Sequence, residues 1–136
     1  MQKITVIVPY HNERHSIENT FISLINQTIV PDEIIFVNSS STDNSDEIIN
    51  NLINTTNSST INIRNISQQT KYPSDSINLG IRLSRNELLA LMDCGLLFDN
   101  NWLEIQLKFM QLNAAEVVLG VVPVSYTHLT LPTKRI

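Results

Sequence analysis

Short apolar runs alternate along this chain with stretches whose apolar residues lie three or four positions apart. The runs are rich in β-branched residues and predict buried strands at 4–8, 33–37, 61–66, 87–92 and 117–121. The helically spaced stretches predict amphipathic helices at 15–27 and 74–84, and two more that begin near residues 44 and 101. Because strands and helices alternate throughout, the chain is predicted to be an α/β domain with a doubly wound, mostly parallel sheet.

The pattern also predicts how some elements pack. In the first helix the inward residues are Ile17, Phe21, Leu24 and Ile25, and in the third Ile77 and Ile81 lie one turn apart as a core stripe. The spacing of Asn44 and Glu47 resembles a capping box at the start of the second helix. The weak alternation at 61–66 favours an edge strand, whereas the strongly apolar run at 87–92 favours a central one.

A cluster of polar residues follows three of the predicted strands, at 10–13, 38–43 and 93–95. In open α/β sheets, ligands bind beyond the carboxyl ends of the strands, where such clusters meet. We therefore expect a ligand crevice at this edge of the sheet.

Composition narrows the class of ligand. The 136 residues allow one domain, and a net charge of −4 without a basic stripe argues against nucleic-acid binding. No apolar run approaches the ~20 residues of a membrane span. A single cysteine, Cys94, and a start without a signal-peptide pattern favour a cytoplasmic location. With three glycines and neither a G-x-G-x-x-G nor a P-loop motif, dinucleotide dehydrogenases and P-loop NTPases are disfavoured.

Three motifs in order resemble those of family 2 glycosyltransferases with a GT-A fold, over residues 2–122. The first is Val-Ile-Val-Pro-Tyr-His-Asn-Glu at 6–13, close to the family's apolar strand followed by Pro-x-x-Asn-Glu. The second is Glu-Ile-Ile-Phe-Val-Asn-Ser-Ser-Ser-Thr-Asp at 33–43. The third is Asp-Cys-Gly at 93–95, followed by Trp-Leu-Glu at 102–104, at the place of the family's Asp-x-Asp box.

The resemblance implies a nucleotide diphosphate-sugar donor bound across the ends of the strands, and an inverting transfer to an unknown glycan, lipid or protein acceptor. The setting it suggests is polysaccharide biosynthesis, and it leaves open an association of the full-length protein with a membrane. The donor-binding residues it implies are Pro9, His11, Asn12, Glu13, Asn38, Ser39, Asp93 and Cys94. Mg²⁺ or Mn²⁺ would neutralise the diphosphate, with Asp93 as the metal-binding residue.

Two positions depart from the family pattern. Asn38-Ser39 stands where the family has Asp-Asp, and Gly95 stands where the last carboxylate of the box commonly binds the metal. These departures leave open an alternative, a nucleotide-sugar-binding α/β module without catalysis. A second alternative is an unrelated doubly wound domain, such as a flavodoxin-like regulator.

The segment 124–136 differs in composition from the body: it lacks asparagine and is rich in threonine and leucine. It resembles a translated sequencing adapter. We therefore expect residues 1–123 to be the amino-terminal, donor-binding half of a truncated glycosyltransferase domain, with the general base beyond it and no catalytic residue within it, and 124–136 to be a non-native tail.

Overall fold

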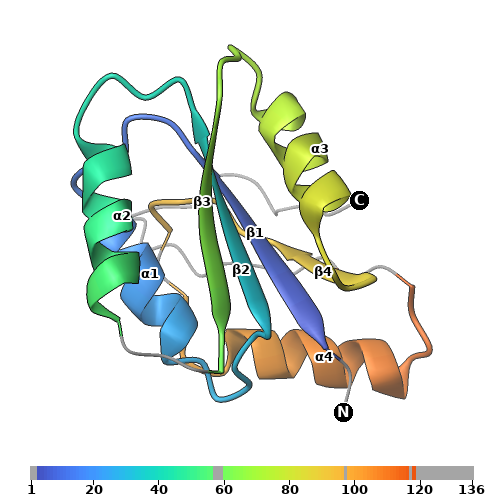
Figure 1. Cartoon of the computed structure of the whole chain (residues 1–136). Coiled ribbons are helices and arrows are strands. Elements are labelled where there is room, and N and C mark those ends of the chain that lie inside the picture. Colours follow the sequence, from blue (N-terminus) through green and yellow to red (C-terminus); the bar gives the residue numbers. More distant parts are fainter. Residues whose placement is uncertain (1–2, 57–59, 97, 117, 119–136) are drawn as a thin grey trace, which may run out of the picture.

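The computed structural model describes residues 3–56, 60–96, 98–116 and 118. These residues form one parallel sheet in the order β3-β2-β1-β4 (Figure 1). The strands are β1 (Ile4–Tyr10), β2 (Glu33–Ser39), β3 (Asn62–Gln68) and β4 (Leu88–Leu91). The helices are α1 (Ile17–Ile25), α2 (Ser45–Thr55), α3 (Pro73–Leu83) and α4 (Trp102–Leu112), and none of them is long and apolar enough to cross a membrane. The strand predicted over 117–121 falls, apart from residue 118, outside the described residues.

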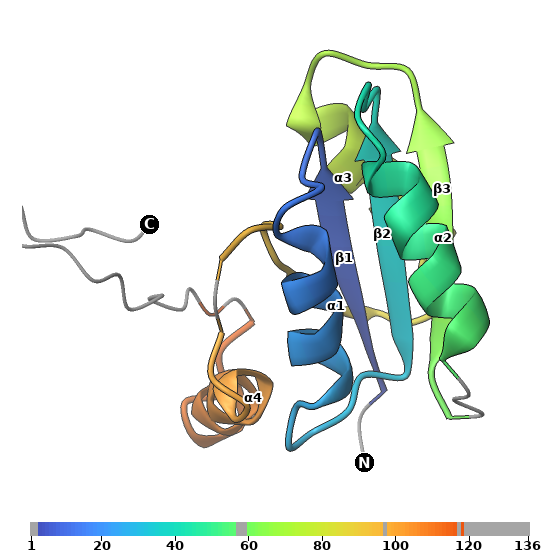
Figure 2. The ribbon, with the colours of Figure 1, turned by 90° about the vertical axis from the view of Figure 1, so that its left-hand side faces the viewer.

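Helices cover both faces of the sheet, as a doubly wound fold requires. Figure 2 shows α1 and α2 in front of the strands and α3 behind them. Alternate strand residues, such as Val6, Val8 and Phe36, are buried on the face that α1, α2 and α4 cover. Phe21 of α1 stacks on Phe36 with ring centroids 6.1 Å apart. The predicted inward stripe of the first helix is therefore confirmed.

The other face is covered by α3, and here the predicted stripe is wrong. The buried residues of α3 are Ser76 and Gly80, whereas Ile81 is 42% exposed. A Cβ on Gly80 would lie 2.6 Å from the Cγ2 of Ile7, so the helix backbone approaches β1 too closely for a larger side chain. Small residues, rather than the isoleucines, therefore form the contact face of α3.

The capping box predicted for α2 is also wrong. Asn44 is the N-cap residue, but its side chain makes no capping hydrogen bond. Instead the Oδ1 of Asp43 accepts hydrogen bonds from the backbone N–H of Ser45, at 2.9 Å, and from its hydroxyl, at 2.5 Å. These bonds satisfy one of the free donors of the first turn and place a carboxylate at the positive end of the helix.

The outermost strands are β3, as predicted, and β4, which was predicted to be central. Among the described residues β4 pairs only with β1, and Leu91 is 51% exposed. The free side of β4 borders an apolar groove of about 400 Å³ that α4 closes on the other side with Trp102, Leu107 and Met110. The apolar residues of β4 thus line this groove, and β4 does not lie between two described strands.

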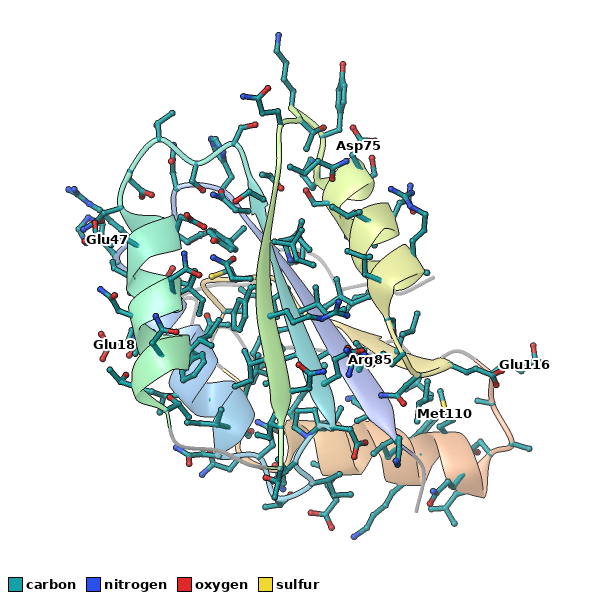
Figure 3. The ribbon with its side chains drawn as sticks, viewed as in Figure 1. Glu18, Glu47, Asp75, Arg85, Met110 and Glu116 are labelled. Atoms are coloured by element: carbon teal, nitrogen blue, oxygen red, sulfur yellow. The ribbon has the colours of Figure 1, made fainter. Side chains whose placement is uncertain are left out.

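A buried carboxylate holds the amino-terminal end of the sheet together. Glu33, 2% exposed, accepts hydrogen bonds from the hydroxyl of Thr5 (2.9 Å), the guanidinium of Arg64 (2.8 Å) and the backbone N–H of Arg85 (2.9 Å). Figure 3 shows Arg85 at the lower end of α3. Burial by itself would raise the pKa of Glu33, but the bonds from Arg85 and Thr5 and the charge of Arg64 outweigh it, and the net effect is a lowered pKa. Glu33 is therefore a structural anion at the end of the sheet opposite the loops that follow the strands.

Candidate donor-binding site

A pocket of about 1030 Å³ lies at the carboxyl ends of the strands. The loops that follow β1, β2 and β3 lie in the upper part of Figure 1. All four strands contribute to it through their ends or the loops that follow. Its walls include Pro9, Tyr10, His11, Glu13, Ser39, Ser40, Ser41, Thr42, Gln69, Thr70, Lys71, Pro73, Asp93 and Cys94. The crevice expected from the polar clusters is therefore present, and six of the eight predicted donor-binding residues line it.

Asn12 is one of the two predicted residues that do not line the pocket, and it holds two of the pocket loops together. Its backbone adopts φ 52°, which asparagine tolerates better than most residues. Its Oδ1 accepts hydrogen bonds from the backbone N–H groups of Thr42 (2.7 Å) and Asp43 (3.2 Å). Its own N–H donates to the hydroxyl of Ser41 at 3.0 Å. The loops after β1 and β2 are thus tied through one side chain.

His11 is exposed in the pocket and has one ring nitrogen fixed by the backbone. Its Nδ1 lies 2.6 Å from the carbonyl oxygen of Ser39, and a carbonyl only accepts, so Nδ1 carries the proton. The Nδ2 of Asn12 lies 3.3 Å from Nε2 and donates to it. These two contacts fix the orientation of the ring, with Nδ1 toward the Ser39 carbonyl and Nε2 toward Asn12.

Asn38 and Ser39, at the end of β2, point to opposite faces of the sheet. The Oδ1 of Asn38 accepts from the N–H of Ser41 at 2.9 Å, so this side chain shapes the loop and does not line the pocket. The hydroxyl of Ser39 lies 2.5 Å from that of Ser76 on α3, and Ser39 does line the pocket. Of this pair, only Ser39 is placed to face a ligand.

The segment after β4 brings Asp93 to the pocket as an exposed carboxylate. The next residue, Cys94, has its thiol 3.7 Å from the Oγ1 of Thr20. Burial raises the pKa of Cys94 to about 11, and the negative charge of Glu13 adds to the rise. The thiol therefore stays protonated at neutral pH and is a poor nucleophile there.

Glu13 is anchored at the start of α1. Its backbone N–H donates to the hydroxyl of Ser45 at 2.8 Å, and its Oε1 accepts from the hydroxyl of Ser16 at 2.6 Å. Its carboxylate lines the same pocket as Asp93. Among the residues that the structure describes, no group of three or more His, Cys, Asp or Glu side chains is arranged to hold a metal ion. Any cation in this pocket would therefore draw its remaining ligands from elsewhere.

The loop after β3 was missed by the motif reading. Gln69, Thr70, Lys71 and Pro73 line the pocket, and Lys71 is the one lysine or arginine among its described lining residues. The signal that pointed to the other loops, a polar stretch directly after a strand, was also present here at 67–71. No family motif covers this stretch.

The fold and the pocket together define a parallel α/β domain with a candidate ligand pocket at the carboxyl ends of its strands. The model of glycosyl transferase family 2 matches residues 5–136, and the chain belongs to this family. Family membership removes the flavodoxin-like alternative.

The chain spans less than half of the relatives it matches. It is 32% identical over 111 residues to an uncharacterized glycosyltransferase of Rickettsia bellii, covering 82% of this chain and 15% of that protein. It is 29% identical over 118 residues to the glycosyltransferase GlyG of Streptococcus pneumoniae, covering 86% of this chain and 38% of that protein.

Solved structures show the same fold. The S. aureus TarS fragment 1–349 in complex with UDP superposes with a TM-score of 0.69 at 22% identity, over 83% of this chain and 33% of that one. The mannosyltransferase PcManGT of Pyrobaculum calidifontis, in complex with GDP-Man and Mn²⁺, gives 0.72 at 22% identity, over 79% of this chain and 32% of that one. The expected GT-A type of α/β fold is thus confirmed.

Proposed function

We propose that this chain is the donor-binding part of an inverting glycosyltransferase that moves a sugar from a nucleotide diphosphate-sugar to a glycan, lipid or protein acceptor. The observation that carries the proposal is the pocket of about 1030 Å³, whose walls come from all three family motifs. The TarS and PcManGT structures, solved with UDP, UDP-GlcNAc or GDP-Man, support the class of donor.

The proposed roles follow the geometry. Pro9 and His11 lie beside the nucleoside, and contacts with the Ser39 carbonyl and the Asn12 side chain hold the His11 ring in place. Ser39 reaches the ligand from β2, while Asp93 faces the ribose and diphosphate. The other two predicted residues act indirectly: Asn12 joins the two loops, and Asn38 shapes the second of them.

A divalent cation fits the donor set of this pocket. Mg²⁺ and Mn²⁺ prefer oxygen ligands and are commonly held by one or two carboxylates together with substrate phosphates. Asp93 supplies such a carboxylate, and the chain does not provide a complete protein cage. When bound, the cation would neutralise the diphosphate as it leaves. The Mn²⁺ in the PcManGT structure supports this assignment.

In the proposed transfer, an oxygen of the acceptor hydroxyl attacks the anomeric carbon from the side opposite the diphosphate. The bond between that carbon and the diphosphate oxygen breaks, and the nucleoside diphosphate leaves with the electron pair. The hydroxyl proton passes to a carboxylate base. We assign that base to no described residue. The cytoplasmic location, the role in polysaccharide synthesis and the boundary at residue 123 stay predictions.

Titration calorimetry of the purified chain with UDP and GDP, with and without Mn²⁺, tests the proposal. We expect one of the two to bind, and Mn²⁺ to strengthen binding. Asp93→Asn should weaken the Mn²⁺-dependent binding about tenfold, which corresponds to ~1.4 kcal/mol. If neither nucleotide binds under any condition, the proposal is wrong.

The alternative of a binding module without catalysis is favoured by Gly95 and by Asn38, whose side chain turns away from the pocket. This alternative predicts the same binding of a nucleotide but no transfer of a sugar. Metal-dependent hydrolysis of the donor by the longer protein would exclude it.

A further inference from the structure

The turn after β4 packs directly against the carboxylate of Glu13. Gly95 adopts φ 96°, a conformation that residues with a side chain rarely adopt. A Cβ at this position would lie 3.1 Å from the Oε1 of Glu13, 3.4 Å from the hydroxyl of Ser16 and 3.6 Å from the Oε2 of Glu13. The space beside the Asp-Cys-Gly turn is therefore filled by a carboxylate that comes from the loop after β1.

Because it packs against this turn, Glu13 differs from an acidic residue that is exposed to solvent in the first turn of a helix. Glu18 of α1 is such a residue, and Figure 3 shows it projecting from the outer side of the helix. Glu13 is half-buried, is held by the hydroxyl of Ser16, and lines the pocket. Its position is set by contacts on both sides, the Ser16 hydroxyl and the Gly95 turn.

The charges around the pocket pose a problem for a diphosphate. Glu13 and Asp93 both face it, and only Lys71 among its described lining residues carries a fixed positive charge. Two carboxylates repel a diphosphate unless a cation lies between them, because like charges at short range oppose each other. The pair is thus favourable to a nucleotide diphosphate only in the presence of a divalent cation.

We infer that Glu13, whose carboxylate packs beside the Gly95 turn, supplies a second carboxylate to the donor's divalent cation. This inference rests on the proposed function, and it concerns the residues that hold the cation. Glu13 and Asp93 then reach the same ion from the loops that follow β1 and β4, and a side chain at Gly95 would crowd the Glu13 carboxylate.

The test is a titration of Mn²⁺ followed by electron paramagnetic resonance, on the whole chain with UDP or GDP, whichever the chain binds. The variants are Glu13→Gln, Glu13→Asp and, as a matched control on the same helix end, Glu18→Gln. We expect Glu13→Gln to raise the dissociation constant of Mn²⁺ at least tenfold and Glu18→Gln to change it less than twofold. Glu13→Asp, which keeps the charge, should fall between the unmodified chain and Glu13→Gln.

A second readout separates metal binding from a structural role. In EDTA, Glu13→Gln should bind the nucleotide as well as the unmodified chain or better, because a negative charge facing the phosphates is gone. Thermal unfolding of each variant confirms that it is folded.

If Glu13→Gln weakens nucleotide binding equally with Mn²⁺ and with EDTA, or leaves the affinity for Mn²⁺ unchanged, Glu13 is not a ligand and the inference is wrong. If the unmodified chain binds neither nucleotide, the proposed function itself fails, and this inference with it.

Discussion

At Asn12 we predict that the alanine variant is less stable than the glycine variant, the reverse of the order usual in a helix. Replacing it with alanine or glycine removes two backbone-to-side-chain hydrogen bonds, of 2.7 and 3.2 Å, that join the loops after β1 and β2. Each is worth about 0.5–1.5 kcal/mol, and since the loop is exposed we take the lower half of that range, which gives about 1–2 kcal/mol for the pair.

The two variants differ in their backbone energies. At φ 52° alanine incurs strain of about 1–2 kcal/mol that glycine avoids. The glycine variant is in turn destabilised by about 0.4–1 kcal/mol relative to the alanine variant, because glycine gives the unfolded chain more conformational freedom. Asn12→Ala should therefore be less stable than Asn12→Gly by about 0.5–1 kcal/mol.

Urea unfolding followed by circular dichroism measures these differences. The control is Asn19, an exposed residue in α1, where helix propensity makes the alanine variant more stable than the glycine variant by about 1 kcal/mol. The reasoning is refuted if Asn12→Ala is the more stable member of its pair, or if both Asn12 variants match the unmodified chain.

Three further predictions concern other parts of the fold. Glu33→Gln should destabilise the chain by about 1.5–3 kcal/mol, because it weakens the hydrogen bonds to a buried carboxylate and leaves the partly exposed Arg64 guanidinium without its anion. The pKa of Glu33 is lower in the folded chain than in the unfolded chain, so the ionised carboxylate stabilises the fold fully above the unfolded pKa of about 4.3. This stabilisation is lost as pH falls through the folded pKa. The difference in urea midpoint between the unmodified chain and Glu33→Gln should therefore narrow in acid. Gly80→Ala should lower stability by about 1–2 kcal/mol, since crowding of Ile7 outweighs the gain in helix propensity, and Ile7→Ala should remove the penalty in a double-mutant cycle. Cys94, with a pKa raised to about 11, should react with a disulfide reagent at pH 8 far more slowly than the same thiol in urea.

Each of these has an outcome that contradicts it. A constant gap between Glu33→Gln and the unmodified chain from pH 7 to pH 3 would mean that Glu33 has no lowered pKa. An additive cycle at Gly80 and Ile7 would mean that the contact between them carries no strain. Equal labelling of Cys94 in folded and unfolded chains would mean that the thiol is open to solvent.

The order of elements was predictable because each had a local signal. The stripe at Ile17, Phe21 and Leu24 faces the sheet in the structure, and all three residues are buried. The predicted carboxyl ends of β2 and β3 fall two residues short, because polar residues such as Asn38 continue the ladder there. Backbone hydrogen bonding, which a hydropathy pattern does not report, extends these strands.

What could not be predicted depends on contacts between distant segments. An isoleucine pair predicted the inner face of α3, but close packing against Ile7 selects Ser76 and Gly80 instead. The tie made by Asn12 reaches thirty residues along the chain, to Thr42. The pocket lining was largely predictable because strand ends of a parallel sheet meet at one edge, whereas the direction of each side chain, as at Asn38, was not.

The position of Glu33 has a consequence for how this domain tolerates change. Its ionic contacts lie at the amino-terminal end of the sheet, whereas the pocket lies at the carboxyl end. Substitutions in the pocket loops therefore leave the ion pair between Glu33 and Arg64 unchanged. Their effects on the free energy of unfolding should be additive with those of substitutions at Glu33. Because of this separation, pocket residues can be exchanged to suit a different ligand while most of the stability of the fold is retained.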